Sequence, residues 1–466
     1  MRKVQRHEQR GSKRVRVTKA VLLRVLDRLG TVLTLILPLF LVHWRGIAEG
    51  CLDGLAVGFL LRSGLTRDWH WCFQRFVWPG LVWWGWLVLC SLPRQVPVPT
   101  EAIASLAQAL LALRFPVAAY ALAFWTLQDP WTRTWCRRLI VVCVLYLGAQ
   151  MFLQAVTGHN LFGNPRFGDG TLTGPYDKPR VSAPFAVMGL PVALFVGAML
   201  GQGMTRSWPK ALVMGGALLP VLGLLVLAGQ RMSLATFLLG TTVCAMVLPS
   251  LRRPALALLI ASPVLIGLLA FMSPEAFGHL VTKTHIQLAH FASSPYGQIY
   301  NRALVMIQAH PVMGLGDDAF RYYCRAKIYL KPGLADLQPD GGGVSVCVQH
   351  THNHVLEAAT NSGLPGAALF VVMIGGWWVA LGRTAKRQVC LSDPDIAWRV
   401  GLFGAAVLHE WPLSSQSAFL NMPLGGIAFL LLGAGLAEAV RDLRVYRPDG
   451  AAIARGALTL SQRPRE

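Results

Sequence analysis

The chain has 466 residues, of which 54% are apolar and only 14% are charged, and its mean hydropathy is positive at +0.48. A soluble protein of this size would be about a quarter charged, so the composition excludes an ordinary soluble domain. The formal net charge of +21 suits a nucleic-acid partner at first sight. However, the basic residues gather in segments between apolar runs, and we therefore expect no nucleic acid to bind.

Apolar runs of about twenty residues recur from end to end, which is typical of membrane-spanning helices. A β-barrel would show short alternating segments instead. Lipid offers no hydrogen bonds, so each span must satisfy its own backbone. We predict an all-α polytopic membrane protein with about 12 transmembrane helices. The predicted spans cover residues 29–45, 49–62, 76–93, 101–127, 137–157, 182–202, 210–228, 231–250, 254–273, 353–382, 398–412 and 422–440.

This map divides the chain into tails, spans and loops. Residues 1–28 hold ten Lys and Arg, too long a basic region for a signal peptide, so we predict a cytoplasmic tail. The remaining parts are spans 1 to 9 (29–273, with a short outer loop at 158–181), a long helical outer loop (274–352), spans 10 to 12 (353–440) and a second tail (441–466).

The basic residues sort by side, because 30 of the 43 Lys and Arg fall on one face of this map. That face is cytoplasmic by the positive-inside rule, so we place both termini there and both long loops outside, in a periplasm. The other thirteen mostly lie in or beside the outer loops and suit an anionic ligand. They are Arg45, Arg94, Arg114, Arg166, Lys178, Arg180, Arg231, Lys283, Arg302, Arg321, Arg325, Lys327 and Lys331.

The long outer loop is not low in complexity, and we predict helices at 274–292, 298–310 and 317–330, with a flexible joint at Gly341-Gly342-Gly343. The first two are amphipathic and suit a membrane surface. We expect a small helical cap over the outer mouth of the bundle.

Nine cysteines are present, and Cys324 and Cys347 share the long outer loop. We hypothesise a disulfide between them, with two free thiols as the alternative.

Three imidazoles and a carboxylate crowd residues 350–357, just before an apolar run. If the whole stretch were helical, His350, Asn353, His354 and Glu357 would share one face. If the helix begins near Thr351 or Asn353, both good N-caps, then His352 lies at its start and faces the outer mouth.

Three interpretations of the histidines stay open. His350 and His354 have the spacing of zinc ligands, but no third ligand is evident. The imidazoles could also serve the structure through backbone hydrogen bonds. The third interpretation is catalytic or substrate-binding, with neutral His352 as a general base.

Three arginines are candidates for binding an anionic substrate. Arg231, in Gln230-Arg231-Met232-Ser233, lies between two apolar spans, where it either reaches lipid head groups or binds a phosphate. Arg302 and Arg180 are each ordinary surface residues when taken alone. Together the three suggest a shared polyanion, and a pyrophosphate fits their guanidinium groups.

The order of these segments resembles the O-antigen ligase and polymerase superfamily, and length and layout are most similar to its O-antigen ligases. The resemblance covers about Arg180 to Pro365. Its segments are Gln230 to Ser233, then Arg302 through His310-Pro311 to Gly316, then His352-Asn353-His354, Glu357 and Gly363-Leu364.

That resemblance implies an inverting, metal-independent membrane glycosyltransferase of the GT-C type with no cofactor. The donor would be O-antigen on undecaprenyl pyrophosphate and the acceptor a sugar hydroxyl of lipid A–core, at the periplasmic face of a bacterial inner membrane. His352 would be the catalytic residue, and Arg231, Arg302 and, less closely matched, Arg180 would bind the pyrophosphate. His350 and His354 receive no role from the resemblance.

Rival functions differ in acceptor or in class. An O-antigen polymerase or a protein O-oligosaccharyltransferase would use the same donor. A lipid flippase would need charges at mid-depth, for which Arg114 before Phe115-Pro116 is a thin candidate. We find no P-loop or dinucleotide fingerprint. Asp317 and Asp318 are expected to cap a helix, which leaves no carboxylate pair for a glycoside hydrolase.

Overall fold

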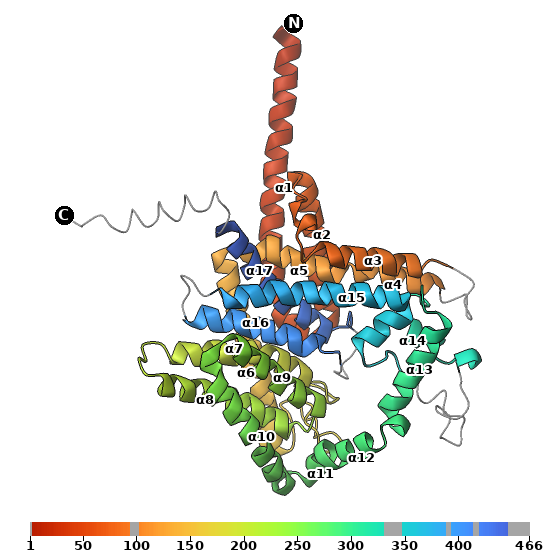
Figure 1. Ribbon diagram of the computed structural model, residues 1–466. Coiled ribbons are helices and arrows are strands. Elements are labelled where there is room, and N and C mark those ends of the chain that lie inside the picture. The colour runs from red at the N-terminus through yellow and green to blue at the C-terminus, as the bar shows by residue number, and fades with distance from the viewer. Residues whose placement is uncertain (1, 94–101, 330–346, 388–392, 413–418, 446–466) are drawn as a thin grey trace, which may run out of the picture.

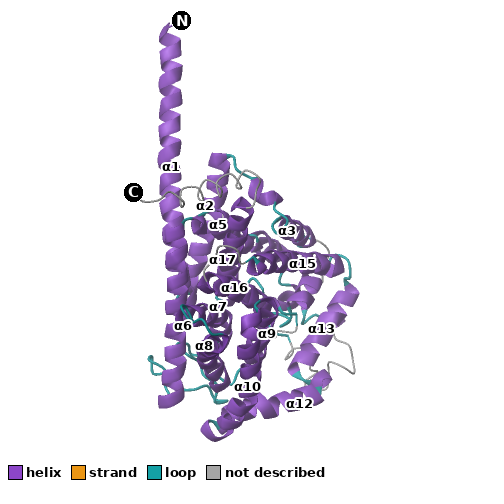
Figure 2. Ribbon diagram, turned by 60° about the vertical axis from the view of Figure 1, so that its left-hand side comes forward, coloured by secondary structure: helices purple, strands orange, loops and turns teal. Residues whose placement is uncertain are grey.

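A computed structural model describes residues 2–93, 102–329, 347–387, 393–412 and 419–445, with the backbone alone for residues 2–18, Lys327 and residues 444–445. These ranges fold into helices, turns and loops and contain no strand (Figures 1 and 2). The helices are α1 (Arg2–His43), α2 (Arg45–Thr66), α3 (Trp78–Cys90), α4 (Ala102–Ala112), α5 (Arg114–Phe124), α6 (Pro130–Thr157), α7 (Ser182–Leu200), α8 (Ser207–Leu227), α9 (Arg231–Val247), α10 (Arg252–Met272), α11 (Pro274–Phe277), α12 (Lys283–Ala289), α13 (Pro295–Ala309), α14 (Ala319–Tyr323), α15 (His354–Lys386), α16 (Asp393–Glu410) and α17 (Leu424–Val445).

Eight helical stretches in the described ranges are long and apolar enough to cross a membrane. They are Lys19–His43, Ala102–Gln128, Pro130–Thr157, Ser182–Leu200, Ser207–Leu227, Pro249–Met272, His354–Lys386 and Leu424–Leu443. The helices α3 and α9 are apolar but shorter. The predicted class, an all-α polytopic membrane protein, is therefore confirmed.

The predicted span 49–62 lies within α2, and most of 398–412 lies within α16, which ends at Glu410, but neither helix is among those eight. The helix α16 carries four charged residues, Asp393, Asp395, Arg399 and Glu410. The Arg399 side chain is 4% exposed and donates hydrogen bonds to Glu438 and Asp442 of α17. Buried ion pairs of this kind lower a helix's hydropathy without exposing charge to lipid. Twelve spans remain a prediction.

The predicted first span, residues 29–45, lies largely in one continuous helix, α1, which extends beyond the body of the molecule toward the N-terminus (Figure 1). Before this span, Asp27 pairs with Arg62 at 3.1 Å and accepts a hydrogen bond from the indole of Trp125 at 2.7 Å, so the charged turn packs against α2 and the end of α5.

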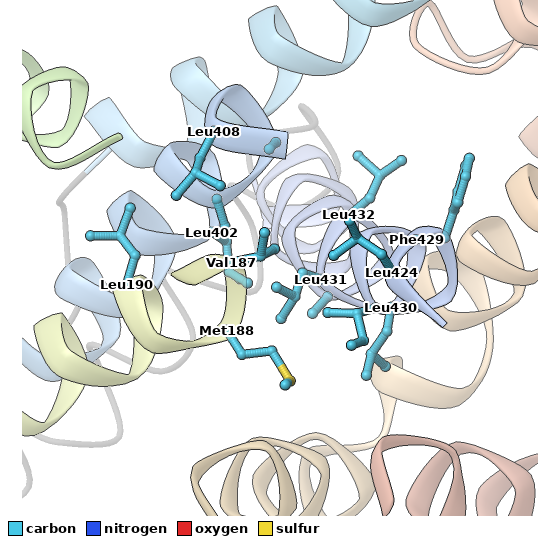
Figure 3. Packing of buried hydrophobic residues seen from close by; sticks show 14 of the residues in the cluster. Val187, Met188, Leu190, Leu402, Leu408, Leu424, Phe429, Leu430, Leu431 and Leu432 are labelled. Atoms are coloured by element: carbon cyan, nitrogen blue, oxygen red, sulfur yellow. The ribbon is translucent and has the colours of Figure 1, made fainter. Parts of the chain in front are cut away.

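The core of the bundle lies where α7, α16 and α17 meet. Figure 3 shows side chains of this core from all three helices, among them Met188 of α7, Leu402 of α16 and Leu431 of α17. The backbones approach closely, because a Cβ on Gly401 would lie 2.4 Å from the Cα of Pro191. Small residues at such crossings are what membrane helices use in place of a hydrophobic driving force.

The predicted helical cap is present as α11 to α14, which run in an arc from the end of α10 to the start of α15 (Figure 1). Its second half has a small core of its own, in which Ile299 and Met306 of α13 pack with Phe320 and Tyr323 of α14. The predicted helix 317–330 is shorter than expected, since α14 ends at Tyr323. Gly341 to Gly343 lie outside the described residues.

A kink in α15 anchors this cap. Gly363 has a φ of +68°, and a Cβ there would lie 2.2 Å from the carbonyl oxygen of Val312, so only glycine fits. At the kink the Leu364 amide donates to Pro311 and the Leu315 amide donates to Thr360. The loop before α14 is thereby attached to α15 by backbone hydrogen bonds.

Candidate active site at the start of α15

The histidine-rich stretch turns into a helix at His354. Asn353 is the N-cap, and its side-chain oxygen accepts hydrogen bonds from the amides of Val355 at 3.0 Å and Leu356 at 3.1 Å. Of the two arrangements left open by the sequence, the helix that begins near Asn353 is therefore the one that forms. His350 and His352 lie in the loop before it.

His352 adopts an unusual backbone conformation, with a φ of +53°. Side chains other than glycine rarely take positive φ, and such residues gather at functional sites. Its ring lies 4.3 Å from that of His350 and 5.5 Å from that of Tyr296. Its carbonyl oxygen accepts a hydrogen bond from the Tyr300 hydroxyl at 3.4 Å. His352 thus lies between His350 in the same loop and helix α13.

A cavity of about 270 Å³ opens beside these histidines. It is lined by Arg45, Trp83, Gln108, Arg114, Asp317, Asp318, Arg321, Gln349, His350, His354, Glu357, Ala358, Asn361, Phe370, Phe419, Leu420 and Asn421. Residues distant in sequence, from α2 to the segment before α17, therefore surround one polar hollow. His352 is not among the lining residues but contacts His350, which is.

Burial sets the protonation of His350. Desolvation lowers the pKa of this imidazole to about 3, with smaller contributions from His352, His354 and Arg321. An imidazole with so low a pKa is neutral at pH 7, so one ring nitrogen donates a hydrogen bond and the other accepts one. In the described part of the chain, neither His350 Nε2 nor Glu357 Oε2 has a hydrogen-bond partner, although both atoms are buried.

The expectation that Asp317 and Asp318 cap a helix was wrong. Asp318 occupies the N-cap position of α14 with a φ of +57°, but its side chain makes no cap hydrogen bond and instead accepts one from Arg321 at 3.1 Å. Asp317 accepts one from Asn361 of α15 at 2.9 Å. Both aspartates line the cavity because the backbone of Asp317 is held by Ser91 and Ser105.

Desolvation and the neighbouring Asp318 raise the pKa of Asp317 to about 7. Desolvation also raises the pKa of Asp318, while Arg321 opposes the shift. These carboxylates are functional candidates that sequence reasoning missed. The available signal was the Gly314-Leu315-Gly316 turn, in which Gly314 and Gly316 have positive φ and steer the chain toward α15.

Arg231, the first residue of α9, lies against a different part of the cap. Its guanidinium donates to the side-chain oxygen of Gln287 at 2.6 Å and contacts Thr284 at 3.5 Å, both on α12. The preceding turn is fixed as well, since His279 bonds to the carbonyl of Gly229 at 3.0 Å. Within the described ranges, the contacts of Arg231 are with neutral groups and not with a carboxylate.

Arg302 lies on α13 and is fully buried. Because α13 packs against α15, Arg302 and His352 belong to neighbouring elements. Arg180 is exposed in the loop before α7. None of Arg180, Arg231 and Arg302 lines the cavity beside His350, so their convergence on one polyanion remains a prediction.

Cys324 and Cys347 form a disulfide with their Cα atoms 5.7 Å apart. The bond joins the end of α14 to the segment that leads into His350. Within the described residues, no group of three or more His, Cys, Asp or Glu side chains is arranged to hold a metal ion. The zinc hypothesis for His350 and His354 thus gains no third ligand there.

None of the curated proteins compared matches the chain. A family model does match: residues 216–371, from α8 into α15, correspond to the family described as O-antigen ligase. The matched third of the chain includes Arg231, Arg302, the cap and His352. It implies a membrane enzyme that resembles glycosyltransferases and acts in lipopolysaccharide assembly. The chain is therefore a multi-pass membrane protein, a third of which matches the O-antigen ligase family.

Proposed function

We propose that this protein is an O-antigen ligase. It transfers O-antigen polysaccharide from undecaprenyl pyrophosphate to a sugar hydroxyl of lipid A–core, with inversion at the anomeric carbon and no metal ion. The family match supports ligase- or polymerase-type chemistry. We choose the ligase because the length and layout of the chain are most similar to those of O-antigen ligases.

The reaction is a single displacement. His352 takes the proton from the acceptor hydroxyl as its oxygen attacks the anomeric carbon. The bond between that carbon and the pyrophosphate oxygen breaks, and the electron pair leaves with undecaprenyl pyrophosphate. Since no covalent intermediate forms, one displacement inverts the centre. Guanidinium groups stabilise the charge that develops on the leaving group.

The position of His352 is the observation that carries this proposal. Its ring contacts His350 at the cavity, and its carbonyl is bonded to Tyr300 on the helix that bears Arg302. A base in that position can face an acceptor on one side and a donor on the other. Its fixed loop conformation limits reorientation during the reaction.

Arg231 is the strongest candidate for the donor pyrophosphate. In the described ranges its hydrogen bonds go to neutral Gln287 and Thr284, so its charge remains available for an anion. An arginine fork binds two phosphate oxygens at once, which a lysine cannot do. We assign Arg302 and Arg180 to the same anion, with Arg302 on the side of His352 and Arg180 at the exposed rim.

We place both termini in the cytoplasm and the cap in the periplasm of a bacterial inner membrane. The disulfide supports this orientation, because disulfides persist in oxidising compartments such as the periplasm.

The decisive experiment uses purified protein in detergent with the lipid-linked polysaccharide and lipid A–core. Formation of polysaccharide joined to lipid A–core supports the ligase, and a flippase could not form it. If the enzyme instead lengthens the lipid-linked chain and leaves lipid A–core unmodified, it is a polymerase and the proposal fails.

A further inference from the structure

The cavity beside His350 is balanced in charge. Three arginines line it, and each already has a carboxylate partner in the structure. Arg45 pairs with Glu49 at 2.9 Å, Arg114 with Asp53 at 3.5 Å, and Arg321 with Asp318 at 3.1 Å. Asp317 and Glu357 add further carboxyl groups to the lining. A site with this balance has no surplus positive charge for a pyrophosphate.

The lining combines polar groups with aromatic rings. Trp83, Phe370 and Phe419 are buried beside the cavity, with ring centroids 5.6 Å apart for Trp83 and Phe370 and 5.0 Å apart for Phe370 and Phe419. Carboxylates and amides hydrogen-bond hydroxyl groups, while aromatic faces pack on apolar C–H surface. A sugar ring presents both kinds of surface.

Two buried polar atoms in this lining point to a ligand. Glu357 Oε2 and His350 Nε2 are buried without a hydrogen-bond partner in the described part of the chain. A buried polar atom left without a hydrogen bond destabilises the fold, so such atoms require an explanation. A hydroxyl can donate to the carboxylate and also bond the imidazole, and one sugar carries several hydroxyls.

The size of the cavity restricts what it can hold. Pockets for drug-sized molecules span about 300–1,000 Å³, and this one is smaller, at about 270 Å³. It suits one sugar ring rather than a disaccharide or a pyrophosphate-linked chain.

We propose that this cavity binds one uncharged sugar ring, the acceptor's terminal residue, through Glu357, Asp317 and His350. The inference rests on the proposed transfer and assigns an acceptor subsite within it. Because the His350 ring contacts that of His352, a ring in the cavity presents its hydroxyl toward the base. The arginines assigned to the donor then lie beyond His352.

The first test separates the two substrates kinetically. Glu357→Gln keeps the shape of the side chain but puts an NH2 group, which cannot accept a hydrogen bond, in place of one carboxyl oxygen. The acceptor KM should therefore rise about tenfold, as for one lost hydrogen bond. The donor KM should stay within about twofold of wild type. Asp317→Asn is a second variant with the same expected pattern, in case the first folds poorly. Glu275→Gln, an exposed carboxylate on α11, is the matched control and should change neither constant.

The second test measures binding without transfer. A phosphate-free oligosaccharide cut from the acceptor core is titrated into the full-length protein in detergent and followed by ligand-observed NMR. Glu357→Gln should weaken its Kd about tenfold, and inorganic pyrophosphate should not displace it. If the oligosaccharide binds as expected but no transfer occurs in any assay, the proposed function is wrong and the sugar-binding subsite is supported.

Three results would overturn the subsite. One is an acceptor KM that both variants leave unchanged, and another is a rise in donor KM in its place. The third is competitive displacement of the oligosaccharide by pyrophosphate, which would make the cavity an anion site.

Discussion

Two polar regions of the protein hold arginines in opposite ways. In the cavity beside His350, Arg45, Arg114 and Arg321 are each paired with a carboxylate. At the start of α9, Arg231 bonds to the neutral side chains of Gln287 and Thr284. Charge alone would make both regions anion sites, but the partners distinguish them. We propose on this ground that the Arg231 side binds the donor pyrophosphate, that the cavity binds an uncharged sugar, and that His352 acts between them.

The largest effect should come from removing the base between the two regions. His352→Ala should reduce the transfer rate by about 10²–10⁴, the usual contribution of a general base, while the protein still inserts and folds. The assay is product formation from both purified lipids. His285→Ala, an exposed histidine on α12, is the control and should keep full activity. A wild-type rate in His352→Ala would mean that another group takes the proton.

The second largest effect should come from removing the guanidinium group of Arg231. Arg231→Ala should raise the donor KM by about 10–100-fold and leave the acceptor KM nearly unchanged, since a charge-assisted hydrogen bond contributes about 1.5–3 kcal/mol. Arg231→Lys should recover only part of the loss. Full recovery by lysine would argue against two-point binding of phosphate. The variant Gln287→Ala, which removes only the neutral partner, should have a much smaller effect.

Asp317 in the cavity should make the stability of the protein depend on pH. The folded protein raises the pKa of Asp317 to about 7, above the unfolded value of about 3.8, so it holds that proton more tightly than the unfolded chain does. Stability therefore falls as pH rises between these two values. Asp317→Asn should remove this loss and stabilise the protein at pH 8 by about 1–2 kcal/mol, less than the full shift because the side chain is partly exposed.

Thermal unfolding in detergent at pH 3 and pH 8 measures that difference. At pH 3 the aspartate is largely protonated in both states, and the variant should match the wild type. Equal melting temperatures at pH 8 would show that Asp317 is ionised without penalty. His350 acts in the opposite direction: its pKa of about 3 lies below the unfolded value of about 6.5, so it destabilises the fold as pH falls between them.

A smaller effect should follow from opening the disulfide. Cys324→Ser combined with Cys347→Ser frees the segment before His350 from α14, so the transfer rate should fall a few-fold without loss of the fold. Hydrogen exchange should rise in residues 347–352 and stay unchanged in α7. Unaltered exchange in that segment would show that backbone contacts alone hold it.

The smallest effect should come from chelation. Because guanidinium groups are assigned the electrostatic task at the leaving group, EDTA should leave the transfer rate unchanged. A strong loss restored by zinc would return His350 and His354 to the role of metal ligands.

Much of the fold could be predicted from the sequence, since lipid imposes a simple rule on length and hydropathy. That rule located the apolar helices, but it does not predict which charged side chains are paired with other residues inside the bundle. Arg399 is sequestered by Glu438 and Asp442 inside the bundle, and Asp27 by Arg62 and Trp125. Pairing between distant segments leaves no local pattern in the sequence, so these contacts could not be predicted from it.

The candidate site was predictable only in part. The Asn353 cap follows from local chemistry, and it fixed where the histidines stand relative to α15. The cavity does not follow from local chemistry, because the position of its aspartates depends on contacts between distant segments. Gly363 allows the 311–316 loop to pack against the kink of α15, and Asn361 then donates a hydrogen bond to Asp317. Seen as sequence, Asp317 and Asp318 are only two acids before a short helix.

The most direct test of the central claim is a structure of the protein with intact donor lipid bound. We predict that the pyrophosphate oxygens contact Arg231 and Arg302, that the anomeric carbon faces the imidazole of His352, and that the cavity beside His350 stays free for the acceptor. A pyrophosphate seated in that cavity among His350, Asp317 and Glu357, with Arg231 still bonded to Gln287, would contradict the account.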